Sequence, residues 1–154
     1  MKLATLCYIE KDGKYLMLHR TKKKNDIHKD FWVGLGGKFE AGETPEECVI
    51  REVYEESGLK IQNPKLRGLM TFPNGFNNEE WYVFLFVATE FIGELNQCNE
   101  GELQWIDKNE LNNIPMREEA RHYTKWIQEN KGMFSAKYIY EDRALKDYAI
   151  TTYE

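Results

Sequence analysis

The chain has 154 residues, the usual size of one domain, and 42% of them are hydrophobic, which excludes disorder as its main description. The net charge of −5 excludes a generally basic nucleic-acid coat protein. No run approaches the ~18 apolar residues of a membrane span. The three cysteines are widely spaced and follow neither a disulfide nor a zinc pattern. We therefore expect one domain over residues 1–154, reduced and cytoplasmic.

Taken in chain order, apolar runs bounded by turn signals predict a series of strands and two helices. The Asp12-Gly13 pair marks a hairpin between the first two strands. The expected strands are Leu3–Ile9, Tyr15–His19, Phe31–Leu35, Leu66–Phe72, Trp81–Thr89, Leu103–Ile106 and a terminal hairpin of Phe134–Tyr140 with Tyr148–Tyr153. The expected helices are Pro45–Ser57, capped by Thr44, and Met116–Lys131, the second ended by Gly132. This order predicts an α/β (α+β) fold with a mixed central sheet covered on both faces.

The first helix has the clearest boundaries. Thr44 and Glu47 form the Thr-x-x-Glu pattern of a capping box, and Pro45 fits the first helical position. Gly58 stands where a left-handed residue ends many helices. The boundaries of this helix are therefore predicted from local sequence alone.

Acidic residues are concentrated on this helix and before it. The segment Lys38–Leu59 has a net charge of −5, so the rest of the chain sums to zero. At 100° per residue, Glu52, Glu55 and Glu56 share an arc of about 100°, beside an apolar stripe. Like charges at this spacing destabilise a helix unless something compensates them, and Mg²⁺ prefers oxygen ligands. The cluster predicts a cation site or, alternatively, a solvated acidic face.

The loop before the helix favours the cation site. Gly36 and Gly37 allow the backbone to approach a metal ion or a phosphate closely. Arg51 is placed to pair with Glu43 or Glu55 and so to hold the cluster together, which is a structural role.

These residues match the Nudix box over residues 37–59, Gly-x5-Glu-x7-Arg-Glu-U-x-Glu-Glu-x-Gly-U with U apolar. The fixed positions are Gly37, Glu43, Arg51, Glu52, Val53, Glu55, Glu56, Gly58 and Leu59. Over nearly its full length the chain resembles bacterial MutT-type 8-oxo-dGTP diphosphatases, including Glu100-Gly101-x-Leu103-x-Trp105. The resemblance implies the Nudix α/β/α sandwich and hydrolysis of a nucleoside diphosphate linked to another group.

The resemblance also implies roles for individual residues. Glu52, Glu55, Glu56, Glu100 and the carbonyl of Gly36 would bind Mg²⁺, with Mn²⁺ as a substitute. The water's proton would go to Glu52, with Glu55 or Glu100 as alternatives. Arg20, Gly37 and Lys38 would contact phosphates. Glu43, Arg51 and Gly58 would be structural.

The positions expected to contact the base differ from those of the eukaryotic enzymes. Eukaryotic 8-oxo-dGTP hydrolases read the purine with an asparagine before the double glycine, and this chain has Val33 there. They also use adjacent aspartates at the start of the last helix, where this chain has Glu118 and Glu119 after Arg117. We expect the base contacts to come from Phe31, Asn77, Glu118 and Glu119.

Hydrolysis of 8-oxo-dGTP to a nucleoside monophosphate and pyrophosphate is the leading hypothesis. Alternatives are another nucleoside diphosphate derivative such as ADP-ribose, an RNA 5′ end bound through the basic segment His19–Lys29, or a non-catalytic nucleotide-binding module. The last is disfavoured because every box carboxylate is present. We expect a small nucleotide as partner, no membrane, no stable nucleic-acid binding, and a monomer or homodimer.

Overall fold

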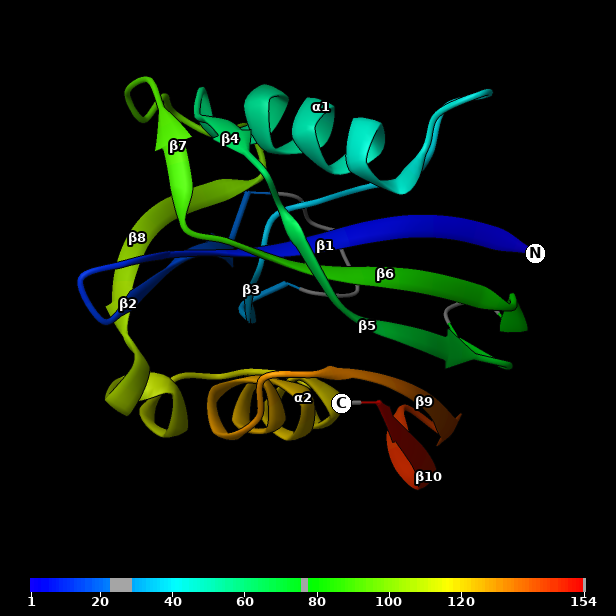
Figure 1. Cartoon of the computed structure of the whole chain (residues 1–154). Helices are drawn as coiled ribbons and strands as arrows, with labels where there is room; N and C mark the ends of the chain where they lie inside the picture. The colour runs from blue at the N-terminus through cyan, green and yellow to red at the C-terminus, as the bar shows by residue number, and fades with distance from the viewer. Residues whose placement is uncertain (23–28, 76–77, 154) are drawn as a thin grey trace.

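The computed structural model describes residues 1–22, 29–75 and 78–153, and these form three layers. Helix α1 (Pro45–Ser57) covers one face of a central sheet and helix α2 (Glu118–Glu129) covers the other (Figure 1). This is the layered α/β/α arrangement that the sequence predicts.

The sheet is mixed and has eight strands. Seven of them run in the order β10-β9-β5-β6-β1-β2-β3, and β8 pairs with β2 along its whole length, Lys14–Arg20. The β1–β6 and β5–β9 pairs are parallel, and the other pairs are antiparallel. The strands are β1 (Lys2–Lys11), β2 (Lys14–Arg20), β3 (Trp32–Val33), β5 (Lys65–Phe72), β6 (Trp81–Ala88), β8 (Gly101–Asp107), β9 (Met133–Glu141) and β10 (Ala144–Tyr153).

Alternation along β1 explains why the sheet is covered on both faces. Cys7 and Ile9 belong to an apolar cluster that includes Val49 and Val53 of α1. Tyr8, between them, belongs to a second cluster that includes Tyr123 of α2. Because successive side chains of a strand point to opposite faces, one strand contributes to both cores.

The first helix begins and ends where the sequence predicts. The Thr44 hydroxyl accepts a hydrogen bond from the Glu47 amide at 3.0 Å, and the Glu47 carboxylate accepts one from the Thr44 amide at 2.9 Å. Gly58 has a φ of 81° and donates its amide to the Tyr54 carbonyl. The capping box and the glycine end are therefore both confirmed.

The second helix is shorter than predicted. It covers Glu118–Glu129, and the chain is already extended at Asn130, so the predicted ends at Met116 and Lys131 and the stop at Gly132 are wrong. The guanidinium of Arg67, on β5, donates to the carbonyls of Ile127, Asn130 and Gly132. An arginine that is distant in sequence thus provides hydrogen bonds to the carbonyls at the helix end. The local sequence around the helix end does not predict this interaction.

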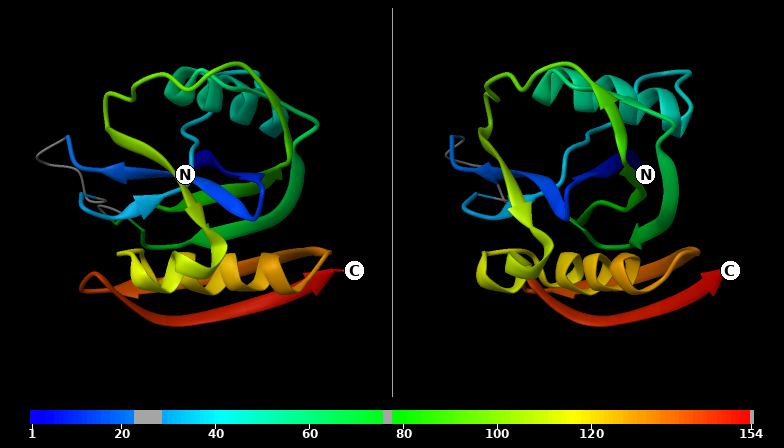
Figure 2. Two further views of the ribbon diagram at one scale, coloured as in Figure 1. Left: turned by 90° about the vertical axis from the view of Figure 1, so that its left-hand side faces the viewer. Right: turned by 60° about the vertical axis from the view of Figure 1, so that its left-hand side comes forward.

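Three short elements are not predicted from the sequence. β4 (Lys60–Gln62) and β7 (Glu90–Ile92) form a separate two-stranded sheet next to the end of α1. The 3₁₀ helix η2 (Lys108–Asn113) connects β8 to the segment before α2. Figure 2 shows β8 running from the α1 side of the molecule towards α2, with the β9–β10 hairpin beside α2.

Candidate active site

The Gly36-Gly37 loop lies between β1 and α1. Its neighbours Leu35 and Lys38 form antiparallel bridges with Cys7 and Ala4 of β1. A Cβ atom on Gly36, which has a φ of 155°, would lie 2.1 Å from the carbonyl oxygen of Thr5. Only glycine fits such an approach, so the first glycine permits the loop to pack directly against the strand.

Glu52 and Glu56 project from α1 onto this loop. A Cβ atom on Gly37 would lie 2.5 Å from the carboxylate carbon of Glu52, so the second glycine provides the space that Glu52 occupies. Glu56 Oε1 accepts a hydrogen bond from the Gly36 amide at 2.7 Å. The two glycines and the two glutamates therefore form one contiguous unit.

Glu100 joins this unit from a different part of the chain. It precedes β8, and the pairing of β8 with β2 places Arg20 opposite Gly101. Arg20 Nη1 lies 3.3 Å from Glu100 Oε2, and the Glu100 carbonyl accepts the amides of Thr21 and Lys22. The tertiary fold thus brings Glu100 to the glutamates of α1.

The acidic groups interact electrostatically. Burial, reinforced by the charges of Glu100 and Glu52, raises the pKa of Glu56 to about 8, against the opposing effects of the Gly36 amide and Arg20. Burial also raises the pKa of Glu52, and Glu55 and Glu100 act in the same direction while Arg51 opposes them. The ionised form of this carboxylate cluster is therefore disfavoured without a cation, and a bound cation would stabilise it.

Arg51 connects the acidic residues of the box. Its guanidinium binds both carboxylate oxygens of Glu43, at 2.6 and 2.9 Å, and also contacts Glu52 at 2.9 Å and Glu55 at 3.3 Å. It donates a further bond to the Lys38 carbonyl at 3.0 Å. The bond from Arg51 is the largest cause that lowers the pKa of Glu43 to about 2. Arg51 therefore ties the start of the box to α1.

The donor set fits a hard divalent cation in an open site. Its side-chain donors are all carboxylate oxygens, and Mg²⁺ usually takes one or two of these together with waters and substrate phosphates. Within residues 1–22, 29–75 and 78–153, no three acidic, histidine or cysteine side chains form a ready-made metal cage. Arg51 and Arg20 hold Glu52, Glu55 and Glu100 in the present arrangement.

The described residues that are expected to contact the base differ in exposure. Glu118 is exposed, whereas Glu119 is buried. Glu119 accepts a hydrogen bond from the Tyr140 hydroxyl and pairs with Arg117 Nε at 3.3 Å. Phe31 is half-buried, and its carbonyl accepts the Arg20 amide. Asn77 lies outside the described residues.

Lys38 lies next to the glycine loop but is directed at an aromatic ring. Its Nζ atom is 5.5 Å from the centre of the Trp81 ring, and Lys38 itself is exposed. Of the basic segment proposed for RNA, only residues 19–22 and Lys29 belong to the described part of the chain.

Sequence reasoning missed Thr5 and Cys48, which contact the glycine loop, and Arg117 and Tyr140, which contact Glu119. Thr5 interrupts an otherwise apolar strand, and this polar position is the one sequence signal for it. Cys48 occupies a variable position of the box, so the box pattern says nothing about it.

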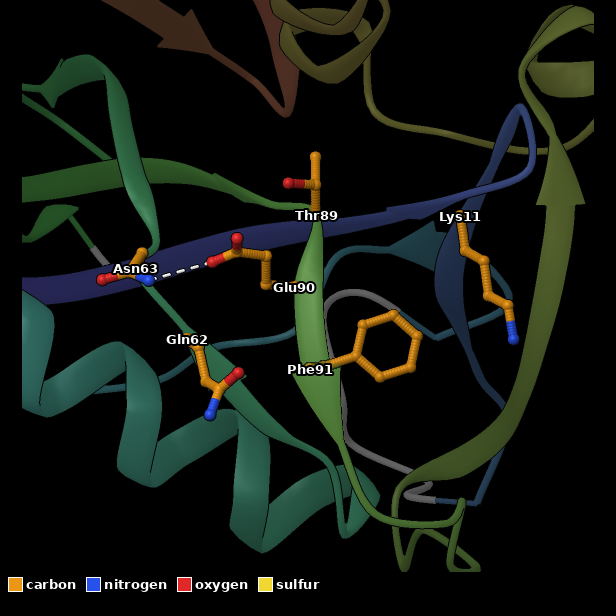
Figure 3. Close-up of a pocket in the computed structure, with 6 residues that line it drawn as sticks. All are labelled: Lys11, Gln62, Asn63, Thr89, Glu90 and Phe91. Carbon is orange, nitrogen blue, oxygen red and sulfur yellow. Dashed lines mark hydrogen bonds between the residues drawn. The ribbon is translucent and has the colours of Figure 1, made fainter.

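The structure also has a shallow depression of about 770 Å³ that none of the box residues lines. Figure 3 shows its side chains, with Asn63 donating to Glu90 at 2.9 Å and Lys11 on the far side of Phe91. Apart from the half-buried Phe91, these residues are exposed. The depression lacks the clustered carboxylates and close glycine backbone of the box.

The NUDIX domain family model matches residues 2–127. The Nudix hydrolase YvcI of Bacillus subtilis (strain 168) is 33% identical over 144 residues, covering 91% of this chain and 87% of the relative. The oxidized purine nucleoside triphosphate hydrolase of Danio rerio is 33% identical over 110 residues, covering 71% of this chain and 69% of that protein.

A similar solved structure is that of the MutT protein from Bacillus halodurans. It superposes with a TM-score of 0.85 and 31% identity, covering 97% of each chain. No helix in the described part of this chain is long and apolar enough to cross a membrane.

Proposed function

The chain belongs to the Nudix hydrolase superfamily, and from the geometry of its box we propose that it is a Mg²⁺-dependent nucleoside triphosphate pyrophosphohydrolase. The proposed substrate is 8-oxo-dGTP, and the products are a nucleoside monophosphate and pyrophosphate. Removal of the oxidised nucleotide would protect the precursor pool for DNA synthesis.

The contact of Glu52 and Glu56 with the Gly36-Gly37 loop, with Glu100 close enough for its charge to act on both, carries this proposal. Glu52 lies against Gly37, Glu56 binds the Gly36 amide, and the charge of Glu100 acts on both glutamates. A purely structural acidic face does not need a partly buried carboxylate with a pKa near 8. The intact box also disfavours a module that only binds nucleotides.

Glu52, Glu56, Glu100 and the Gly36 carbonyl are the proposed Mg²⁺ donors, with Glu55 as a further one directly or through water. Mn²⁺ has similar ligand preferences and is expected to substitute. When bound, the ion would neutralise phosphate charge and lower the pKa of a coordinated water.

In the proposed reaction, water attacks phosphorus at the anhydride between the α- and β-phosphates. The new P–O bond forms as the bridging P–O bond breaks, and pyrophosphate separates from the monophosphate. Glu52 takes the proton of the attacking water, and Glu55 and Glu100 are the alternative bases. Arg20 and Lys38 provide positive charge for the phosphates, and the Gly37 backbone permits their close approach.

Two observations support an oxidised purine as the base. The Danio rerio relative is named for hydrolysis of oxidised purine nucleoside triphosphates. In this chain, Glu119 stands at the start of α2 and offers carboxylate oxygens that accept hydrogen bonds. We propose that Glu119 reads the purine edge, with Phe31, Asn77 and Glu118 as additional contacts.

Pyrophosphate and phosphate release with Mg²⁺ and with EDTA tests the proposal. The substrates are 8-oxo-dGTP, dGTP, the other nucleoside triphosphates and ADP-ribose. We expect Mg²⁺-dependent pyrophosphate release with 8-oxo-dGTP far ahead of dGTP. In Glu52→Gln, kcat should fall by about 10² to 10⁴ because the general base is lost.

Glu46→Gln is the matched control, because Glu46 is an exposed glutamate in the first turn of the same helix. Its activity should equal that of the unmodified protein. Activity confined to ADP-ribose would show that the protein is a hydrolase with a different substrate from the one proposed. Nucleotide binding without turnover of any substrate would establish the binding module instead.

A further inference from the structure

The carbonyl oxygen of Gly37 has contacts to two side chains and one backbone amide. The Thr5 amide donates to it at 2.8 Å, and the Thr5 hydroxyl lies 3.4 Å from it. The Cys48 thiol lies 3.6 Å from the same oxygen. Thr5 Oγ1 and Cys48 Sγ are themselves 3.4 Å apart. These groups form a triangle around the carbonyl of a single residue of the glycine loop, and the guanidinium of Arg51 also contacts Cys48 Sγ at 4.0 Å.

The triangle joins three segments that are distant in sequence. Thr5 belongs to β1, Cys48 to α1 and Gly37 to the loop between them. Thr5 is 3% exposed and Cys48 is fully buried, yet neither belongs to the apolar cluster on either face of the sheet. Each of the two side chains has one proton, so both protons can be used within the triangle. The arrangement is therefore a small polar contact outside both apolar clusters.

The loop that this triangle holds is the one that the acidic residues contact. Glu52 lies against Gly37, and Glu56 is bonded to the neighbouring amide of Gly36. Catalysis is sensitive to displacements of about 1 Å. A shift of the glycine loop would therefore change its geometry relative to both Glu52 and Glu56. Two glycines make the loop intrinsically permissive, so its conformation has to be imposed by neighbours.

We propose that Thr5 and Cys48 are positioning residues, which hold the Gly36-Gly37 loop by the Gly37 carbonyl in register with Glu52 and Glu56 and so set the affinity of the site for its divalent cation. The kcat measurement rests on the proposed function, because it requires hydrolysis of a nucleotide. Metal binding in the absence of nucleotide tests it independently.

The first test compares two substitutions at one position. Thr5→Val keeps the shape of the side chain and removes the hydroxyl, whereas Thr5→Ser keeps the hydroxyl. Mn²⁺ binding to the nucleotide-free protein is measured by electron paramagnetic resonance, and kcat is measured as a function of Mg²⁺ concentration. We expect Thr5→Val to weaken Mn²⁺ binding and to lower kcat, each by about tenfold. In Thr5→Ser, both quantities should stay within about threefold of those of the unmodified protein.

The second test separates positioning from general stability. Cys48→Ala removes the thiol, and Val49→Ala removes apolar volume from the adjacent, equally buried residue of α1. Both should lower the unfolding midpoint, but only Cys48→Ala should weaken Mn²⁺ binding. Unchanged Mn²⁺ affinity in Thr5→Val and Cys48→Ala, or equal weakening in Val49→Ala, would overturn the proposal. If the unmodified protein binds Mn²⁺ but hydrolyses no nucleotide, the proposed function is wrong. The Mn²⁺ affinities of the Thr5, Cys48 and Val49 variants would still test the positioning role.

Discussion

Glu56 illustrates how one buried carboxylate links stability to metal binding. Its pKa rises from the ordinary 4.5 to about 8, with burial as the largest cause. Between these two values the folded protein binds a proton that the unfolded chain has released. The free energy of unfolding of the metal-free protein therefore falls as the pH rises through this window.

We expect the metal-free protein to lose on the order of 3 kcal/mol of unfolding free energy between pH 5 and pH 8.5 through this group. Urea unfolding in EDTA at a series of pH values measures it. Glu56→Gln should flatten the dependence, because an amide does not titrate, whereas Glu46→Gln should leave it unchanged. Equal slopes for Glu56→Gln and the unmodified protein would contradict the assignment. Added Mg²⁺ should stabilise the protein more at pH 8.5 than at pH 5.

Helix α1 is the element that places the box carboxylates. Its capping box satisfies two groups at the helix start, and its apolar residues Val49 and Val53 pack on the sheet. Glu52 and Glu56 are one turn apart and so reach the same loop. The rigidity of the helix therefore fixes the spacing between the two carboxylates.

Loss of the cap should destabilise the protein without altering the site chemistry. Thr44→Ala should lower the free energy of unfolding by about 1 kcal/mol, because the Glu47 amide loses its acceptor. Thr44→Ser retains the hydroxyl and should stay close to the unmodified protein. Chemical denaturation gives the difference, and kcat at 25 °C should be unchanged in both variants. A lower kcat in Thr44→Ala, measured under conditions in which all of the variant is folded, would show that the helix start also shapes the site.

At the scale of the whole molecule, α2 and the terminal hairpin enclose a polar group on the second face of the sheet. Glu119 is 5% exposed, with Tyr140 of β9 and Arg117 as its partners. The guanidinium of Arg117 also lies 5.0 Å from the centre of the Tyr140 ring. A buried carboxylate with charged and hydroxyl partners is well fixed, as recognition of a base edge requires.

We expect Glu119→Gln to reduce the preference for 8-oxo-dGTP over dGTP by about tenfold in kcat/KM, mainly through KM, because a carboxylate acceptor becomes partly a donor. Glu129→Gln is the control, since Glu129 is an exposed glutamate at the other end of the same helix. Competition kinetics with the two nucleotides measures the ratio. An unchanged preference in Glu119→Gln would remove Glu119 from base recognition and leave it a purely structural role.

Local sequence was enough to predict the parts of this protein that depend on neighbouring residues. The ends of α1 follow from Thr44, Pro45, Glu47 and Gly58, because capping acts within one turn. The alternation of strand residues and the box pattern, which are equally local, predicted the α/β/α layers and the superfamily. The four-residue spacing of Glu52 and Glu56 likewise predicted that both carboxylates lie on one side of a helix.

Which distant groups meet depends instead on how the separate elements pack. Glu100 reaches the box through the pairing of β8 with β2, and Thr5 reaches Cys48 through the packing of α1 beside β1. The end of α2 depends on Arg67 from another strand, and β4 and β7 exist only as partners of each other. Contacts of this kind arise when separate elements pack together, so residue spacing along the chain does not encode them in a readable pattern.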